Sequence, residues 1–145
     1  MKILNHRLSL AITFLWIGFV CAISFMEAWL KFRAPGVTLS IGLAIGKLVF
    51  SALNRMELLF GFLLILSFFI AGNKPLPYDV ILFGTIIAVL LVQTFWILPE
   101  LSKRADLIIQ NKKVLESNLH VLYVGMEVSK VVLLSFFGNN LFKKK

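Results

Sequence analysis

Long apolar segments alternate with short polar ones along this chain. Four of the apolar segments are close to the length of about 20 residues at which an α-helix crosses a hydrocarbon layer of about 30 Å. Their predicted limits are residues 8–30, 52–72, 79–98 and 119–137. The pattern therefore predicts an all-α integral membrane protein, a four-helix bundle that residues 1–145 form as one domain.

Turn-forming residues separate the predicted spans. Pro35 and Gly36 follow the first span, and Pro99 is expected to end the third. The segment between the second and third spans reads GNKPLPYD, which is typical of a tight polar turn. The fourth span is expected to begin after Ser117, a good N-cap residue, and to close at Gly138. Four crossings place both termini on the same side of the membrane.

Two further amphipathic segments are predicted to lie at the membrane surface. Before the second span, Lys47, Ser51 and Asn54 recur at helical spacing on one face of an otherwise apolar helix, as in helices that lie along a membrane. One long, bent helix that continues into the second span is an equal alternative, because no proline separates the two parts. Between the third and fourth spans, the apolar residues at helical spacing are Leu101, Ala105, Ile108 and Leu115.

A GxxxG motif, from Gly42 to Gly46, lies in the first of these amphipathic segments. Two glycines four residues apart allow another helix to approach closely. We therefore expect Gly42 and Gly46 to pack against a neighbouring helix.

The composition narrows the classes of function. With 59% hydrophobic and 15% charged residues, the chain differs from soluble domains, in which charged residues make up about 25%. The net charge of +8 does not point to nucleic acid, because Lys and Arg flank the apolar segments, and anionic lipid headgroups are the expected partner. Cys21 is the single cysteine, which excludes an intrachain disulfide, and no zinc-binding spacing is present.

The first apolar segment is similar to a signal peptide in its basic start. Its apolar core of about 20 residues exceeds the usual 7 to 15, and no cleavage motif follows it. We therefore predict a retained span in a multi-pass protein of the bacterial cytoplasmic membrane.

Polar and ionisable residues inside the apolar spans are the candidate functional residues, because such residues are rare and costly there. The fourth span carries four of them on one face by the 3.6-residue period, namely His120, Tyr123, Glu127 and Lys130. We expect this face of the fourth span to meet a face of the first span, which carries Thr13, Trp16, Ser24, Glu27 and Lys31. We predict a proton, cation or polar-ligand pathway lined by Glu27, Arg55, Glu57, Gln93, His120, Tyr123, Glu127 and Lys130. In this pathway Glu127 would take up and release protons, with His120 as a relay nearer the surface.

A structural interpretation of the same residues stays open. Glu127 and Lys130 stand three apart and could pair with each other or with Arg55, which would hold the helices in register. Glu27 and Lys31 lie where headgroups begin, so they can reach water without any function. The tryptophans are interpreted as interface or packing residues.

A characteristic order of features runs through three segments of the chain. They are MEAWLKFRAPGVTLSIGLAIGKLVFSALNRMELLF, LPELSKRADLIIQ and SNLHVLYVGMEVSKVVLL. A first span is followed by a glycine-punctuated helix with Phe50, a proline-ended third span, a charged connection and a fourth span that opens near a histidine. This order resembles the transmembrane protein 205-like family, a domain of unknown function, with Pro99 and His120 as the best matches. The resemblance implies a four-helix membrane protein with no established reaction.

Two classes of function are compatible with these observations. The first is a non-enzymatic transporter- or channel-like unit or an accessory subunit, acting as a homo-oligomer or in a larger complex, because four helices enclose little space. The alternative is a membrane-embedded enzyme or cofactor carrier, for which the serine–histidine–acid, phosphate-loop and HExxH motifs are missing. His6 and His120 are expected at opposite interfaces, about 30 Å apart, so they cannot both ligate one haem iron. We therefore expect no cofactor and no metal.

Overall fold

The computed structural model describes residues 2–71 and 76–143. Within these ranges the chain is helical apart from its connections, and no strand is present. In this part of the chain, four helical runs are long and apolar enough to cross a membrane: His6–Arg33, Leu39–Ile70, Pro77–Ile109 and Leu119–Lys143. The all-α class and the presence of four helices of this length and composition are confirmed.

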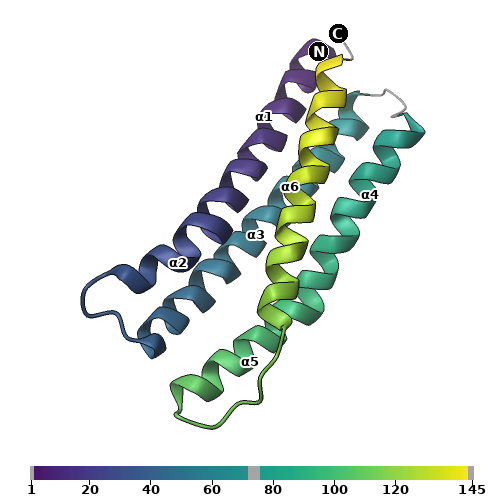
Figure 1. Cartoon of the computed structure of the whole chain (residues 1–145). Coiled ribbons are helices and arrows are strands. Elements are labelled where there is room, and N and C mark those ends of the chain that lie inside the picture. The colour runs from purple at the N-terminus through teal and green to yellow at the C-terminus, as the bar shows by residue number, and fades with distance from the viewer. Residues whose placement is uncertain (1, 72–75, 144–145) are drawn as a thin grey trace.

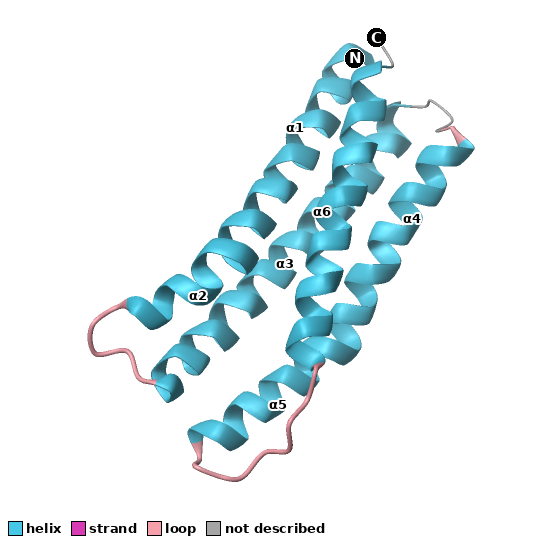
Figure 2. Ribbon diagram, in the orientation of Figure 1, coloured by secondary structure: helices cyan, strands magenta, loops and turns pink. Residues whose placement is uncertain are grey.

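The four runs form an antiparallel bundle (Figure 1). The start of the first run and the end of the last run lie at the same end of the bundle, which we call the terminal end. Connections 34–38 and 110–118 lie at the opposite end, which we call the loop end (Figure 2). Residues 72–75, where half of the predicted polar turn falls, lie outside the described residues.

The first run changes its helical period along its length. It consists of α1 (Lys2–Val20), the π-helix η1 (Cys21–Glu27), α2 (Ala28–Leu30) and the 3₁₀-helix η2 (Lys31–Arg33). The run ends before Pro35, and Gly36 adopts a φ of 82°, a left-handed value that glycine tolerates best. The break predicted at Pro35 and Gly36 is therefore present.

The second run, α3 (Leu39–Ala71), is one uninterrupted helix of 33 residues. The Thr38 hydroxyl accepts a hydrogen bond from the Ile41 amide at 3.3 Å, as an N-cap side chain does. The segment expected as a separate surface helix is the first half of α3. Because no proline interrupts it, this segment follows the second of the two alternatives, the single long helix.

The third run continues past Pro99, where the sequence predicts a helix end. It consists of α4 (Pro77–Val92), the π-helix η3 (Gln93–Ile97) and α5 (Leu98–Ile109), without interruption. Pro99 lies in the first turn of α5, directly after the π-helical residues. The first turn of a helical segment tolerates proline, because the amide hydrogen that proline lacks would be unsatisfied there anyway. The predicted amphipathic segment therefore continues this run as far as Ile109, whereas Leu115, expected on its apolar face, lies exposed in connection 110–118.

The fourth run, α6 (Leu119–Lys143), begins where the sequence predicts. The Ser117 hydroxyl accepts a hydrogen bond from the Leu119 amide at 3.2 Å. The sequence predicts that this helix ends at Gly138, but the helix continues to Lys143 at the terminal end. A Cβ on Gly138 would lie 3.4 Å from side-chain atoms of both Thr13 and Phe14, so this glycine allows close packing of α6 on α1.

In the terminal half of the bundle, the polar residues Ser9, Thr13, Ser67 and Asp79 are buried among apolar side chains. Four of these apolar side chains, Leu64, Ile86, Leu134 and Phe137, are 0% exposed, and Ile12 is 5% exposed. We call these five residues the apolar layer. They come from all four runs, with α1 packed on α3 and α6, and α4 packed on α6.

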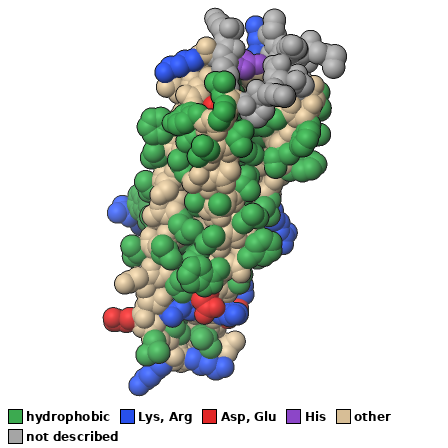
Figure 3. Space-filling view, turned by 90° about the vertical axis from the view of Figure 1, so that its right-hand side faces the viewer, with side chains coloured by type: hydrophobic (Ala, Val, Ile, Leu, Met, Phe, Trp, Pro, Cys, Tyr) green, Lys and Arg blue, Asp and Glu red, His purple; other side chains and the backbone are tan. Residues whose placement is uncertain are grey.

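The outer surface carries many apolar side chains (Figure 3). Phe69, Phe95 and Leu48 are 81%, 77% and 73% exposed. Acidic and basic side chains gather at the loop end, in the lower part of Figure 3. Extensive exposed apolar surface is unusual on soluble monomers and marks contact with lipid or with another protein.

Candidate functional site

One lysine and two glutamates are buried together between α3 and α6. Lys130 and Glu127 are 0% exposed, and Glu57 is 1% exposed. The Lys130 ammonium contacts Glu57 Oε1 and lies 3.1 Å from Glu127 Oε1. We call these three residues the charged cluster. With two carboxylates and one ammonium, its formal charge is −1 when all three groups are ionised.

The helical period turns these residues toward the inside of the bundle. Glu127 and Lys130 stand three apart on α6, and Leu134 continues the same buried face toward the terminal end. Glu57 and Leu64 stand two turns apart on α3 and share its buried face. The charged cluster therefore occupies core positions, at the loop-end side of the apolar layer.

Two neutral donors bind the carboxylates of the charged cluster. Trp16 Nε1 donates to Glu57 Oε1, and Gln93 Nε2 donates to Glu127 Oε1, both at 2.9 Å. All four runs therefore meet at the charged cluster or its first neighbours. Trp16 is missing from the site residues predicted from sequence. Its position in the middle of a span is the feature by which the sequence could have identified it, because tryptophan in membrane proteins is usually enriched at the interfaces.

Three buried oxygens beside the charged cluster find no hydrogen-bond partner among the described residues. They are Ser24 Oγ, Gln93 Oε1 and Glu127 Oε2, and we call them the three buried oxygens. The Tyr123 hydroxyl lies close to both Ser24 and Glu127. Buried polar atoms are nearly always paired, so this group calls for an explanation.

Two of the three buried oxygens come from π-helical segments. Ser24 lies in η1, and Gln93 is the first residue of η3. Both segments pack against α6. A π-helical turn shifts which side chains face inward relative to the rest of the helix, and such turns are frequent at functional sites. Two local departures from the α-helix therefore meet beside the charged cluster.

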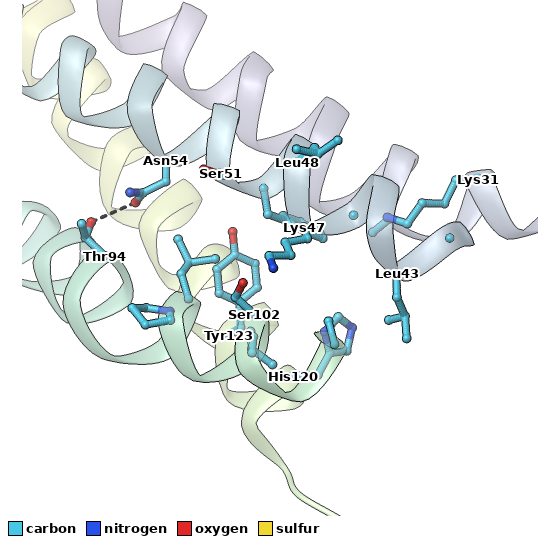
Figure 4. Close-up of a pocket in the computed structure, with 18 of the residues that line it drawn as sticks. Lys31, Leu43, Lys47, Leu48, Ser51, Asn54, Thr94, Ser102, His120 and Tyr123 are labelled. Carbon is cyan, nitrogen blue, oxygen red and sulfur yellow. Dashed lines mark hydrogen bonds between the residues drawn. The ribbon is translucent and has the colours of Figure 1, made fainter. Parts of the chain in front are cut away.

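A cavity of 620 Å³ lies between η2, α3, α5 and α6, toward the loop end (Figure 4). The polar side chains that line it are Lys31, Lys47, Ser51, Asn54, Thr94, Ser102, His120 and Tyr123. The Thr94 hydroxyl donates to Asn54 Oδ1 at 2.9 Å (Figure 4). Lys47 and His120 are exposed, so the cavity opens at the surface. Tyr123 lines the cavity and also lies beside the charged cluster, so it connects the two.

Lys31, which lines the cavity, forms a separate ion pair with Glu27. Lys31 Nζ lies 3.0 Å from Glu27 Oε2, and the Lys31 side chain is 8% exposed. The same ammonium lies 5.1 Å from the ring centre of Phe50 and 5.5 Å from that of Phe32, both within cation–π range. This pair is therefore held by local partners rather than by the charged cluster.

Gly42 and Gly46 face side chains that line the cavity. A Cβ on Gly42 would overlap the Phe32 ring, and a Cβ on Gly46 would lie 3.2 Å from Lys31 Nζ. The two glycines of the GxxxG motif therefore allow α3 to approach the last turns of the first run.

Five of the eight predicted site residues come together in the structure: Glu57, Gln93, Tyr123, Glu127 and Lys130. Glu27 lies apart with Lys31, and His120 lies at the rim of the cavity. Arg55 is exposed on α3 and forms no ion pair among the described residues. The alternative in which Arg55 pairs with Glu127 is therefore wrong, because α3 turns Glu57, and not Arg55, toward α6.

No three His, Cys, Asp or Glu side chains come together as metal ligands within residues 2–71 and 76–143. Comparison with protein-family models, curated proteins and solved structures finds no match to this chain. Functional conclusions therefore rest on the geometry of the chain itself.

Proposed function

We propose that the chain is a non-enzymatic multi-pass membrane protein whose charged cluster takes up and releases one positive charge, a proton or a cation. It acts as a transporter- or channel-like unit, or as an accessory subunit of a larger complex. The observation that carries this proposal is the buried formal charge of −1 beside a cavity that opens at the surface.

Insertion in a membrane is supported by the length and apolar character of the four described runs and by their exposed apolar side chains. Four crossings place both termini on one side of the bacterial cytoplasmic membrane. The first half of α3 and the whole of α5 then lie near the interface. Lys103, Lys112 and Lys113, at the loop end, contact anionic headgroups there. The resemblance to the transmembrane protein 205-like family agrees with this arrangement.

The electrostatics of the charged cluster supports charge uptake. An uncompensated charge in a low-dielectric interior costs several kcal/mol, so a positive species that binds beside it relieves part of this cost. Lys130 already contacts one oxygen of each glutamate, which leaves Glu127 Oε2 free to bind a further positive group. Tyr123 lines the cavity and lies close to Glu127, so the cavity supports a route for the positive species from the surface.

Vesicles that contain the purified protein test the transporter-like form of the proposal. A proton gradient and a cation gradient are imposed in turn, and uptake is followed with a pH-sensitive dye inside the vesicles and with a radioactive cation. We expect uptake above that of empty vesicles, lost in Glu127→Gln and kept in Glu100→Gln, which changes an exposed carboxylate on α5. If neither gradient gives uptake, the stand-alone unit is excluded, and proteins that co-purify with the native chain identify the larger complex.

A further inference from the structure

We infer that the three buried oxygens, together with the Tyr123 hydroxyl, form a binding site for an alkali-metal cation such as Na⁺. This inference rests on the proposed function and names the positive species that the charged cluster takes up. The four oxygens belong to η1, η3 and α6, so a bound ion would join the first, third and fourth runs.

The chemistry of the four groups favours a hard cation. Glu127 offers a carboxylate oxygen, Gln93 an amide carbonyl oxygen, and Ser24 and Tyr123 hydroxyl oxygens. Hard cations prefer such oxygen ligands. An anion would instead need donors, and the neighbouring donors of Gln93 and Lys130 are already bound to carboxylates.

The charge count selects a monovalent ion. One monovalent cation cancels the formal charge of −1 of the charged cluster, whereas a divalent cation would reverse it to +1 beside the Lys130 ammonium. The set also contains a single carboxylate oxygen, from Glu127, whereas sites for Ca²⁺ usually draw on several carboxylates. The ligand set and its charge therefore match an alkali-metal ion.

The cavity explains how such an ion reaches the site. Tyr123 lines the cavity and lies beside both Glu127 and Ser24. Lys31 and Lys47 also line the cavity, but Glu27 and Asp106 pair with them at 3.0 Å and 2.6 Å. Their charges are thereby balanced, and they do not repel a cation on its way to Tyr123.

Purified protein in sodium-free choline buffer tests the inference. Its melting temperature is measured while NaCl, LiCl, KCl or choline chloride is added, and binding of radioactive Na⁺ is measured by equilibrium dialysis. We expect a saturable rise in melting temperature with at least one alkali-metal chloride, none with choline chloride, and about one bound ion per chain. Because choline is a larger cation of the same charge, choline chloride controls for ionic strength.

Ser24→Ala is the sharpest variant, because Ser24 Oγ has no hydrogen-bond partner to lose among the described residues. It should fold as the wild type does and raise the half-saturating cation concentration about ten-fold, the effect of losing one ligand worth about 1.4 kcal/mol. Ser135→Ala is the matched control, since Ser135 is exposed on α6 and its hydroxyl donates to the Val131 carbonyl of its own helix. Glu127→Gln should abolish binding.

Three results would overturn the inference, and they differ in what they say of the proposed function. The titratable groups that face Glu127 are Glu57, Lys130 and Tyr123, and protonation within this group also changes the charge at the site. The melting temperature is therefore also measured between pH 5 and pH 9. If acidification alone stabilises the protein and no alkali-metal ion binds, the charged cluster takes up a proton and only the cation site is wrong. If neither acid nor cation has an effect, both proposals fail. Equal affinity in wild type and Ser24→Ala would place the ion elsewhere.

Discussion

Lys130 of α6 and Glu57 of α3 lie 73 residues apart in the chain and in direct contact in the buried centre of the bundle. Lys130 also lies 3.1 Å from Glu127, so two carboxylates share one ammonium. A single carboxylate would be enough to balance that ammonium. The three residues therefore contribute unequally to stability: the lysine has no substitute, whereas each glutamate can stand in for the other.

Lys130→Met should be the most damaging single change in the charged cluster. It leaves two buried carboxylates with no ammonium beside them, so we expect the free energy of unfolding to fall by about 3 to 5 kcal/mol. Unfolding in one detergent, followed by circular dichroism, measures the change. Lys103→Met is the control, because Lys103 belongs to an exposed pair of the kind worth about 0 to 1 kcal/mol. Equal stability of the two variants would contradict the prediction.

Glu57→Gln and Glu127→Gln should each be tolerated, within about 1 kcal/mol of wild type, because the remaining carboxylate still balances Lys130. The double variant strands the lysine and should lose up to about 3 kcal/mol more than the two single losses combined. A double-mutant cycle in the same detergent measures this coupling. Simple additivity of the two losses would show that the carboxylates do not share Lys130.

Gly42→Ala should destabilise the packing of α3 on the first run by about 1 to 3 kcal/mol, because its Cβ would overlap the Phe32 ring. Adding Phe32→Ala should recover much of the loss, since the obstructing ring is then gone. Gly84→Ala is the control, because a Cβ there meets nothing within 4 Å. Thermal melting of the four proteins checks the prediction, and a loss in Gly42→Ala that Phe32→Ala does not reduce would contradict it.

Single cysteines in a Cys21→Ser background should separate the two ends of the bundle. Arg33→Cys ends the first run and Lys113→Cys falls in connection 110–118, both at the loop end, whereas Lys143→Cys ends α6 at the terminal end; all three positions are exposed. A membrane-impermeant thiol reagent added to sealed vesicles should label the first two from one side and the third from the other. If Lys113→Cys and Lys143→Cys react from the same side, the four-crossing arrangement is wrong.

The lengths of the apolar segments were enough to predict four long apolar helices, and helical periodicity predicted the buried face of α6, but the start of the second run at Leu39 and the extension of the third to Ile109 were not predicted. Tyr123, Glu127 and Lys130 are spaced four and three residues apart, and this spacing alone brings them to one side of a helix. The same counting over-extended the face by one turn, because His120 lies at the rim of the cavity rather than in the core. Periodicity says which residues share a face but not where along the helix the core ends.

The contact between Lys130 and Glu57 could not be predicted in the same way. It depends on the rotation and height of α3 relative to α6, which are set by packing of the whole bundle. Counting by 3.6 residues also fails across Cys21–Glu27, because a π-helix has a longer period. Ser24 is therefore buried while Glu27, expected on the same face, is half-buried with Lys31.

The apolar layer has an electrical consequence for the proposed function. It lies between the charged cluster and the terminal end, and the cavity lies on the loop-end side, so under the proposed function a positive species reaches Glu127 from the loop end and leaves by the same route. Such a site is the end of a half-channel, and an ion that occupies it has crossed only part of the transmembrane voltage. Its affinity should therefore vary with membrane potential, by less than the limit of about 2.3 kcal/mol per elementary charge per 100 mV that applies to a full crossing.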